Sequence, residues 1–178
     1  MTKKSVFVVI IGLIAFYFFI FDQEFDFNQK FSKTVGKNLS GSYRPTIQEI
    51  QNSTFTNGSS GEEIKLSNLI KDNTNVVLHF WATWCVPCVE EIASLYRYAL
   101  NQKNAENPPV FVFIAVNDKW VNITKFLEKS KLDQSKVGYW LLDNSGEAYT
   151  KFRVDKVPES FILRSGQVER LSGAQVWK

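Results

Sequence analysis

A single strand-to-helix junction constrains this chain more than any other feature of its sequence. The run Val76–Trp81 is mostly apolar and has the length of a strand, which is typical of a central strand buried on both faces of its sheet. After the pair Cys85 and Cys88, apolar side chains recur with helical spacing at positions 88, 92, 95, 96 and 99. A second apolar run, 109–116, follows, so the sequence predicts a βαβ unit with parallel strands.

The flanking segments extend this unit into an α/β domain over residues 46–178. Further strands are predicted at 53–56, 62–65, 139–142, 160–163 and 168–171, and a second helix at 121–131 with Phe126 and Leu127 facing inward. The first two strands form a polar hairpin, and a tight turn makes the last two antiparallel. The expected architecture is a mixed central sheet flanked by helices.

The amino terminus has the character of a membrane anchor. Residues 6–21 are apolar apart from one glycine, a run longer than the apolar region of a cleaved signal, and no small-x-small cleavage site follows it. Lys3 and Lys4 precede the run, and basic residues stay on the cytoplasmic side. We therefore expect residues 1–21 to form one transmembrane helix, an uncleaved single-pass anchor in the cytoplasmic (inner) membrane. Residues 22–45 would be a juxtamembrane linker, and the domain would be periplasmic or otherwise extracytoplasmic.

Composition excludes several classes of protein. Two Cys and one His are too few for a tetrahedral structural zinc site or a disulfide-stapled scaffold. The formal net charge of +3 includes Lys3 and Lys4, and the rest of the chain has 19 basic against 18 acidic side chains, which gives no electrostatic footprint for nucleic acid. We therefore expect neither a bound metal nor a nucleic-acid partner.

The two cysteines stand where the start of a helix can act on them. The unpaired N–H groups and partial positive charge of that terminus favour the thiolate of Cys85, which would be the exposed nucleophile. Cys88 lies one turn later on the apolar stripe and would stay shielded until it attacks the mixed disulfide and releases the substrate. This placement predicts thiol-disulfide exchange.

The residues around the pair resemble a known family. The string FWATWCVPC at 80–88, followed by Glu90-Glu91, resembles the active site of thioredoxins, specifically the membrane-anchored TlpA/ResA group that includes the CcmG/DsbE thiol reductases of cytochrome c maturation. The likeness extends over about residues 53–172. It implies a thioredoxin-like fold, a redox-active disulfide between Cys85 and Cys88, no cofactor, protein thiols or disulfides as substrates, and a membrane electron donor of the DsbD/CcdA type.

The same resemblance assigns substrate contacts to three further residues. It implies a cis peptide bond between Val157 and Pro158, facing the cysteines, where the backbone of Val157 can pair with an extended substrate segment. The alternative is a trans loop proline, the common state of such bonds. Trp84 would offer partners a flat apolar surface, and its alternative is core packing.

Two titratable residues are candidates for proton transfer or for tuning the cysteine pKa values. Glu91 lies one helical turn beyond Cys88, where ResA-like proteins carry an active-site glutamate, and its alternative is a solvated helix carboxylate. His79 lies on the central strand and could accept the Cys88 proton as a neutral imidazole. The alternative for His79 is a core histidine bonded to the backbone.

The chain departs from the family pattern in two places. Ala93 stands where the family usually has a helix-kinking proline, which predicts a straighter helix. The carboxy-terminal helix of the family is absent or truncated after 168–171, so another segment, such as 22–45, or a partner would cover that sheet face.

These features predict an extracytoplasmic, membrane-anchored thiol:disulfide oxidoreductase that reduces protein disulfides, with cytochrome c maturation as one setting. Two alternatives stay open. Sco-type copper-handling proteins share the anchor and the fold, but they use Cys-x-x-x-Cys with a distant downstream His, whereas here two residues separate the cysteines and His79 lies upstream. The other alternative is a non-catalytic thioredoxin-like binding module with a structural disulfide.

The dipeptide Val86-Pro87 predicts the redox character of the pair. It carries no His or other cation that would stabilise the Cys85 thiolate further, so we expect a moderately to strongly reducing couple. Equilibration with glutathione measures the reduction potential, and a value as oxidising as about −120 mV would contradict this expectation.

Overall fold

The computed structural model describes residues 43–70 and 75–178, which belong to the unit Ser40–Lys178. The predicted anchor at 1–21 and most of the predicted linker at 22–45 lie outside the described residues. Within the described ranges, no helix has both the length and the apolar character needed to cross a bilayer.

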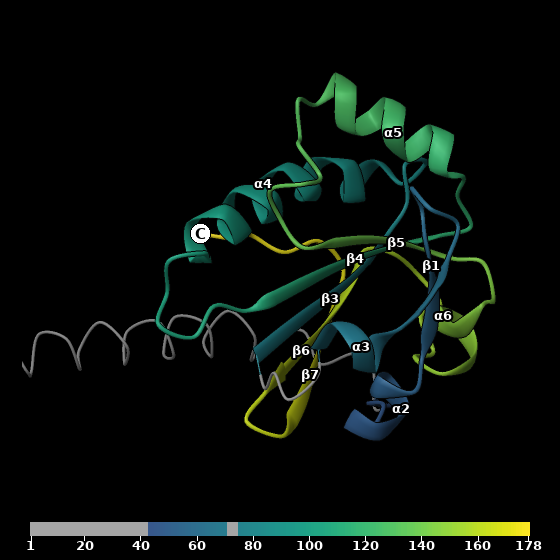
Figure 1. The fold of residues 1–178 in the computed structure, drawn as a ribbon, viewed down its shortest axis with the longest axis vertical. Helices are drawn as coiled ribbons and strands as arrows, with labels where there is room; N and C mark the ends of the chain where they lie inside the picture. The colour runs from purple at the N-terminus through teal and green to yellow at the C-terminus, as the bar shows by residue number, and fades with distance from the viewer. Residues whose placement is uncertain (1–42, 71–74) are drawn as a thin grey trace, which may run out of the picture. The chain divides into compact units, whose positions relative to one another are not determined.

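A mixed sheet forms the centre of the domain (Figure 1). In the described part of the chain it has seven strands in the order β2-β1-β5-β4-β3-β6-β7. The strands are β1 (Thr54–Asn57), β2 (Glu63–Lys65), β3 (Asn75–Trp81), β4 (Val110–Val116), β5 (Tyr139–Asp143), β6 (Glu159–Arg164) and β7 (Gln167–Ser172). The pairs β3/β4 and β4/β5 are parallel, and all other neighbours are antiparallel. The predicted mixed sheet and both predicted hairpins are confirmed.

Helices cover the two faces of the sheet (Figure 1). On one face lie α4 (Val86–Gln102) and α5 (Trp120–Lys129), and on the other lie the short helices α2 (Ile47–Gln51), α3 (Leu66–Ile70) and α6 (Glu147–Thr150). The connections β3-α4-β4 and β4-α5-β5 each join parallel neighbours, so the predicted βαβ unit is confirmed and a second one shares β4. Helix α4 continues without a break through Ala93.

The spacing of apolar residues in the sequence does not predict the three short helices α2, α3 and α6. Each has four or five residues, too few for an apolar stripe to repeat. Nevertheless, α2 has a readable start, because Thr46 and Glu49 form a reciprocal capping box. The Thr46 hydroxyl accepts a hydrogen bond from the Glu49 N–H at 3.2 Å, and the Glu49 carboxylate accepts one from the Thr46 N–H at 2.7 Å.

Strand β3 is buried on both faces of the sheet, as predicted. Six of its seven residues are buried. Phe80 packs against Phe152 on the face of α2, α3 and α6, with ring centroids 5.0 Å apart. Trp81 points to the opposite face and packs against Phe126 of α5, with centroids 5.3 Å apart. Because α5 also buries Leu127, the predicted inward face of this helix is confirmed.

After β7 the chain returns to α4. Residues 173–178 form no helix. The Trp177 side chain is 8% exposed and packs against Tyr98 of α4 with ring centroids 5.7 Å apart. The carboxy-terminal segment thus covers part of α4 with one large side chain, that of Trp177.

Glu159, the residue that follows Pro158, forms a buried ion pair with Arg170. Glu159 is fully buried and accepts hydrogen bonds from Arg170 Nε at 2.6 Å and Nη2 at 2.9 Å. The Ser172 hydroxyl donates a third bond at 2.5 Å, and Arg170 Nη2 also donates to the carbonyl of Arg153 at 2.8 Å. The pair therefore ties β6 to β7 directly behind the Val157-Pro158 loop.

We expect Glu159→Ala to lower the free energy of unfolding by about 3–5 kcal/mol, because it leaves the Arg170 guanidinium buried without its anion. Urea unfolding measures the change. The matched control Ser172→Ala removes one hydrogen bond to the same carboxylate and should cost about 1–2 kcal/mol. A loss for Glu159→Ala no larger than that of the control would contradict the assignment.

Candidate active site

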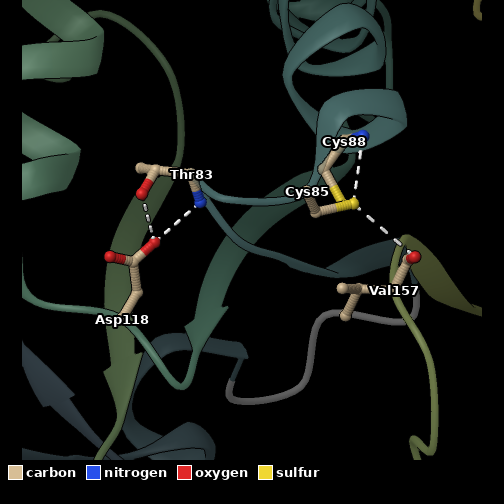
Figure 2. Close-up of a disulfide and its surroundings, with 5 residues drawn as sticks. All are labelled: Thr83, Cys85, Cys88, Asp118 and Val157. Carbon is tan, nitrogen blue, oxygen red and sulfur yellow. Dashed lines mark hydrogen bonds between the residues drawn. A yellow bond between two sulfur atoms is a disulfide. The ribbon is translucent and has the colours of Figure 1, made fainter.

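Cys85 and Cys88 lie at the junction of β3 and α4 and form a disulfide with an S–S distance of 2.16 Å (Figure 2). Cys85 is the N-cap of α4, and its Sγ accepts a hydrogen bond from the Cys88 N–H at 3.3 Å. Pro87 lies in the first turn, where a helix has no use for its missing N–H. The predicted placement of the pair at the start of a helix is confirmed.

The two cysteines differ in their access to solvent. Cys85 is 6% exposed and thus buried, so the predicted exposed position of the nucleophile is wrong for the disulfide form, whereas Cys88 has no exposed surface at all. Val86, between them, is 69% exposed. A partner can therefore approach Cys85 over an apolar surface while Cys88 stays covered, which is the asymmetry needed between an attacking and a resolving thiol.

The Val157-Pro158 peptide bond is cis, as predicted, and faces the disulfide. The carbonyl oxygen of Val157 lies 3.6 Å from Cys85 Sγ (Figure 2). Val157 is half-buried and Pro158 is buried. The trans alternative is therefore wrong, and the loop before β6 presents backbone directly beside the first cysteine.

Asp118 fixes the loop that precedes Cys85. Its Oδ2 accepts hydrogen bonds from the Thr83 N–H at 2.6 Å and from the Thr83 hydroxyl at 2.7 Å (Figure 2). Its Oδ1 accepts from the Lys119 N–H and from Asn122 Nδ2. Sequence reasoning alone misses Asp118, although a signal exists. The residue follows β4, and the carboxyl ends of the parallel strands β3 and β4 meet at one edge of the sheet.

Trp84 projects from the surface beside Cys85. Its side chain is 59% exposed, and its Nε1 donates a hydrogen bond to the Asn117 carbonyl at 3.0 Å. Asn117 adopts a left-handed backbone with φ of 50°, which asparagine tolerates, and its Nδ2 donates to the Tyr149 hydroxyl. The core-packing alternative for Trp84 is therefore wrong, because the ring is held at the surface.

Glu91 is buried on α4, so its interpretation as a solvated carboxylate is wrong. The residue is 4% exposed, and its Oε1 accepts a hydrogen bond from Trp177 Nε1 at 2.6 Å. Its Oε2 lacks a hydrogen-bond partner among the described residues. Burial raises the pKa of Glu91 to about 7, and the hydrogen bonds from Trp177 and from the backbone of Gln175 only partly oppose this rise.

His79 is buried in β3, opposite Ser160 of β6. Its Nδ1 lies 2.9 Å from the Ser160 hydroxyl, so its partner is a side chain and the expected backbone bond is wrong. Nε2 has no hydrogen-bond partner in the described part of the chain. Burial lowers the pKa of His79 to about 3, because the charged imidazolium would lose its hydration.

The described residues contain no group of three or more His, Cys, Asp or Glu side chains that could hold a metal ion. The groups that the structure places at the site are the disulfide, the carboxyl of Glu91 and the apolar side chains beside Cys85.

Comparison with known proteins places these features in a family. Residues 39–168 match the model of the Redoxin family. The chain is 26% identical over 112 residues to sporulation thiol-disulfide oxidoreductase A of Bacillus subtilis, a match that covers 62% of this chain and 64% of that protein. It is 26% identical over 98 residues to thiol-disulfide oxidoreductase ResA of Geobacillus thermodenitrificans, covering 54% and 52%. The chain thus spans between half and two thirds of the length of these relatives.

A solved structure shares the fold. It is a secreted Mycobacterium tuberculosis disulfide oxidoreductase described as homologous to Escherichia coli DsbE, with a TM-score of 0.59 and 24% identity over 72% of this chain and 90% of that one. The thioredoxin-like α/β fold is confirmed by this likeness. The resemblance of the chain to the TlpA/ResA group is confirmed by the Redoxin match and the ResA relative.

Glu91 should make stability depend on pH. Its pKa is about 7 in the folded state and near its ordinary value of 4.5 in the unfolded state. Between these values the folded protein keeps a proton that the unfolded chain releases, so the free energy of unfolding falls as pH rises, by about 3 kcal/mol in all. Glu91→Gln removes this dependence, and the variant should gain stability relative to wild type between pH 4 and pH 8.

Urea midpoints at the two pH values measure this gain. The control is Glu90→Gln, which changes the exposed neighbouring carboxylate and should keep a constant difference from wild type. The same constant difference for Glu91→Gln would show that its carboxyl is not buried in solution.

Proposed function

The chain belongs to the Redoxin family, and from this premise we propose that it is a thiol:disulfide oxidoreductase that reduces disulfides in proteins. The observation that carries the proposal is the asymmetric Cys85–Cys88 disulfide at the start of α4. One sulfur lies beside exposed apolar side chains and the other is fully buried. The relatives named as thiol-disulfide oxidoreductases support the same reaction.

Reduction of a substrate proceeds in two exchanges. The thiolate of reduced Cys85 attacks one sulfur of the substrate disulfide, which breaks the S–S bond, releases one substrate thiolate and leaves a mixed disulfide. Cys88 then loses its proton and attacks the Cys85 sulfur, and the second substrate thiolate leaves. The substrate gains two electrons and two protons, and the protein ends with the Cys85–Cys88 disulfide.

Hydrogen bonds and burial around the cysteines favour each of the two exchange reactions. The N–H of Cys88 points at Cys85 Sγ from 3.3 Å and stabilises negative charge there. The Thr83–Asp118 hydrogen bonds hold the preceding loop, so that Cys85 stays at the N-cap. Because Cys88 is buried, it reaches only the sulfur already bound at Cys85, which favours release of substrate over attack on a second protein.

The resolving step needs a group that accepts the Cys88 proton. His79 is a poor acceptor, because an imidazole whose pKa is lowered to about 3 cannot readily take a proton from a thiol with an ordinary pKa of about 8.5. Glu91, with a pKa raised to about 7, is a stronger base and lies one helical turn after Cys88. We therefore assign proton transfer to Glu91 and a packing role to His79.

The substrate contact is proposed at Trp84, Val157 and Pro158. Trp84 is held at the surface by its bond to Asn117, and Val157 offers its backbone beside Cys85 Sγ. An extended segment around a substrate cysteine can add to this backbone as a short strand and rest a side chain on the Trp84 ring. Recognition through backbone and apolar contacts accommodates substrates of many sequences.

The apolar run at the amino terminus is the basis for the setting that we propose for the reaction. We propose that residues 1–21 anchor the protein in the cytoplasmic membrane with the domain outside the cytoplasm, the periplasm in a two-membrane cell. A reductase there needs electrons from a membrane thiol transporter of the DsbD/CcdA type. Cytochrome c maturation, with an apocytochrome disulfide as substrate, is one role that the resemblance to the CcmG/DsbE reductases implies.

Copper handling has less support than thiol exchange. The single histidine of the sequence, His79, is buried in β3 and its Nδ1 is engaged with Ser160. A non-catalytic binding module would have no need for a fully buried second cysteine beside a first one that keeps a small exposed surface. Both alternatives are decided by the experiment below.

We expect the wild-type protein to reduce insulin with dithiothreitol as the electron source, and we expect Cys88→Ser to abolish turnover while trapping a mixed disulfide. The reason is that Cys85 can still attack, whereas no thiol remains to resolve the adduct. Turbidity follows insulin reduction, and non-reducing gels with mass spectrometry identify the adduct.

The matched control is Cys85→Ser, which should show neither turnover nor adduct. Turnover in both serine variants, or no adduct with Cys88→Ser, would contradict the mechanism. No turnover in the wild type would support a binding module.

A further inference from the structure

The carboxy-terminal segment 173–178 connects two parts of the active site. Its first residue, Gly173, donates its N–H to the carbonyl of Pro158 at 2.9 Å. Three residues before its end, the side-chain amide of Gln175 turns back and donates to the carbonyls of Ser172 and Gly173. The segment then reaches α4, where Figure 1 shows the end of the chain beside the helix and Trp177 Nε1 bonds Glu91.

We propose that Trp177 is a positioning residue for the redox reaction, which caps the Glu91 carboxyl and thereby controls its exchange of protons with the buried Cys88. The inference rests on the proposed function, because it concerns the group to which the proton of the resolving thiol is assigned. It adds to that function a remote residue on which the proton acceptor depends.

Trp177 acts on the carboxyl in two opposite ways. Its ring is 8% exposed and excludes water from Glu91, which favours the neutral acid. Its indole N–H donates at 2.6 Å to Oε1, which favours the carboxylate. Burial by all surrounding residues outweighs the hydrogen bonds in setting the pKa of Glu91, and Trp177 contributes to both the burial and the hydrogen bonding of this carboxyl.

The positions of Glu91 and Cys88 on α4 connect Trp177 with the resolving cysteine. Glu91 and Cys88 are three residues apart on α4, and side chains at this spacing are neighbours on one face of a helix. Both are buried, so a proton transferred from Cys88 to Glu91 would not have to pass through bulk solvent. The carboxyl also keeps one oxygen, Oε2, without a hydrogen-bond partner among the described residues.

The other titratable groups around the cap act less directly. The Tyr98 phenol belongs to the ring packed against Trp177, and burial raises its pKa while Arg164 opposes the rise. Lys178 follows Trp177 and is exposed. Burial and two hydrogen bonds are the causes of the Glu91 pKa shift, and no charged side chain is among them. Trp177 is therefore the residue to substitute.

Two substitutions separate the two effects of Trp177. Trp177→Phe keeps an aromatic cover but removes the donor, so the Glu91 pKa should rise by about one pH unit, the size expected for one hydrogen bond to a charged group. Trp177→Ala removes the cover and lets water reach the carboxyl, so the pKa should fall toward its ordinary value of 4.5. The control Val176→Ala changes a side chain that is 70% exposed and should shift nothing.

The first measurement is a carbon-13 NMR titration of the Glu91 carboxyl in the oxidised full-length protein. The second is the pH profile of insulin reduction, whose inflection near neutral pH should move in the same direction as the titration and should disappear in Glu91→Gln. A residue that merely fills space would lower stability in both Trp177 variants without moving the two pKa values in opposite directions.

The outcomes decide the proposal separately from the proposed function. Unchanged titrations, or shifts of both variants in one direction, overturn the role of Trp177. A shifted Glu91 titration with an unshifted pH profile of insulin reduction also overturns it, because Trp177 would then change the pKa of Glu91 without affecting the reaction. If Trp177→Ala does not fold, the shift in Trp177→Phe decides alone. A wild type without turnover refutes the oxidoreductase itself and, with it, any role of Trp177 in catalysis.

Discussion

The site depends on the position of β3 between a parallel and an antiparallel neighbour. The ladder with β4 pairs Trp81 with Ala115, and the ladder with β6 pairs Phe80 with Glu159. Since β3 and β4 end at the same edge of the sheet where β6 begins, three connecting segments converge there. These segments bring together Cys85, the Asp118 carboxylate and the Val157 carbonyl (Figure 2). A shift of either ladder by one residue would turn alternate side chains to the wrong face and separate the parts of the site.

Two buried titratable groups, His79 in β3 and Glu91 on α4, have opposing effects on stability. His79, with a pKa lowered to about 3, stays neutral in the folded state, so the free energy of unfolding falls as pH drops from about 6.5 toward 3. Glu91, with a raised pKa, has the opposite slope between about 4.5 and 7. In the range where the windows overlap, the two slopes partly cancel. The stability of the whole protein should therefore depend on pH only weakly in this range, although the separate contributions of Glu91 and His79 each change with pH.

Two tryptophans serve the site through opposite degrees of exposure. Trp84 is held at the surface by the Asn117 carbonyl, so its ring is available to a partner. Trp177 is buried against α4, and its indole N–H is directed to Glu91. In both cases the hydrogen bond of the indole nitrogen fixes the ring, and the surroundings decide whether its apolar surface meets a substrate or excludes water.

The sequence by itself determined the features that arise within one segment. The apolar run of β3, the stripe of α4 and the cysteine pair between them are local patterns, and they were sufficient to predict the βαβ unit and the cysteine pair at the start of a helix. The cis bond at Val157-Pro158 followed from family resemblance, because no local pattern specifies it. Only the tertiary structure decided the state of Glu91, because its donor Trp177 lies 86 residues away. It also decided the support of the cysteine loop, since Thr83 and Asp118 are 35 residues apart. The helical spacing of apolar residues predicts on which side of α4 a residue lies. The burial and the pKa of that residue depend on which other parts of the chain pack against that side.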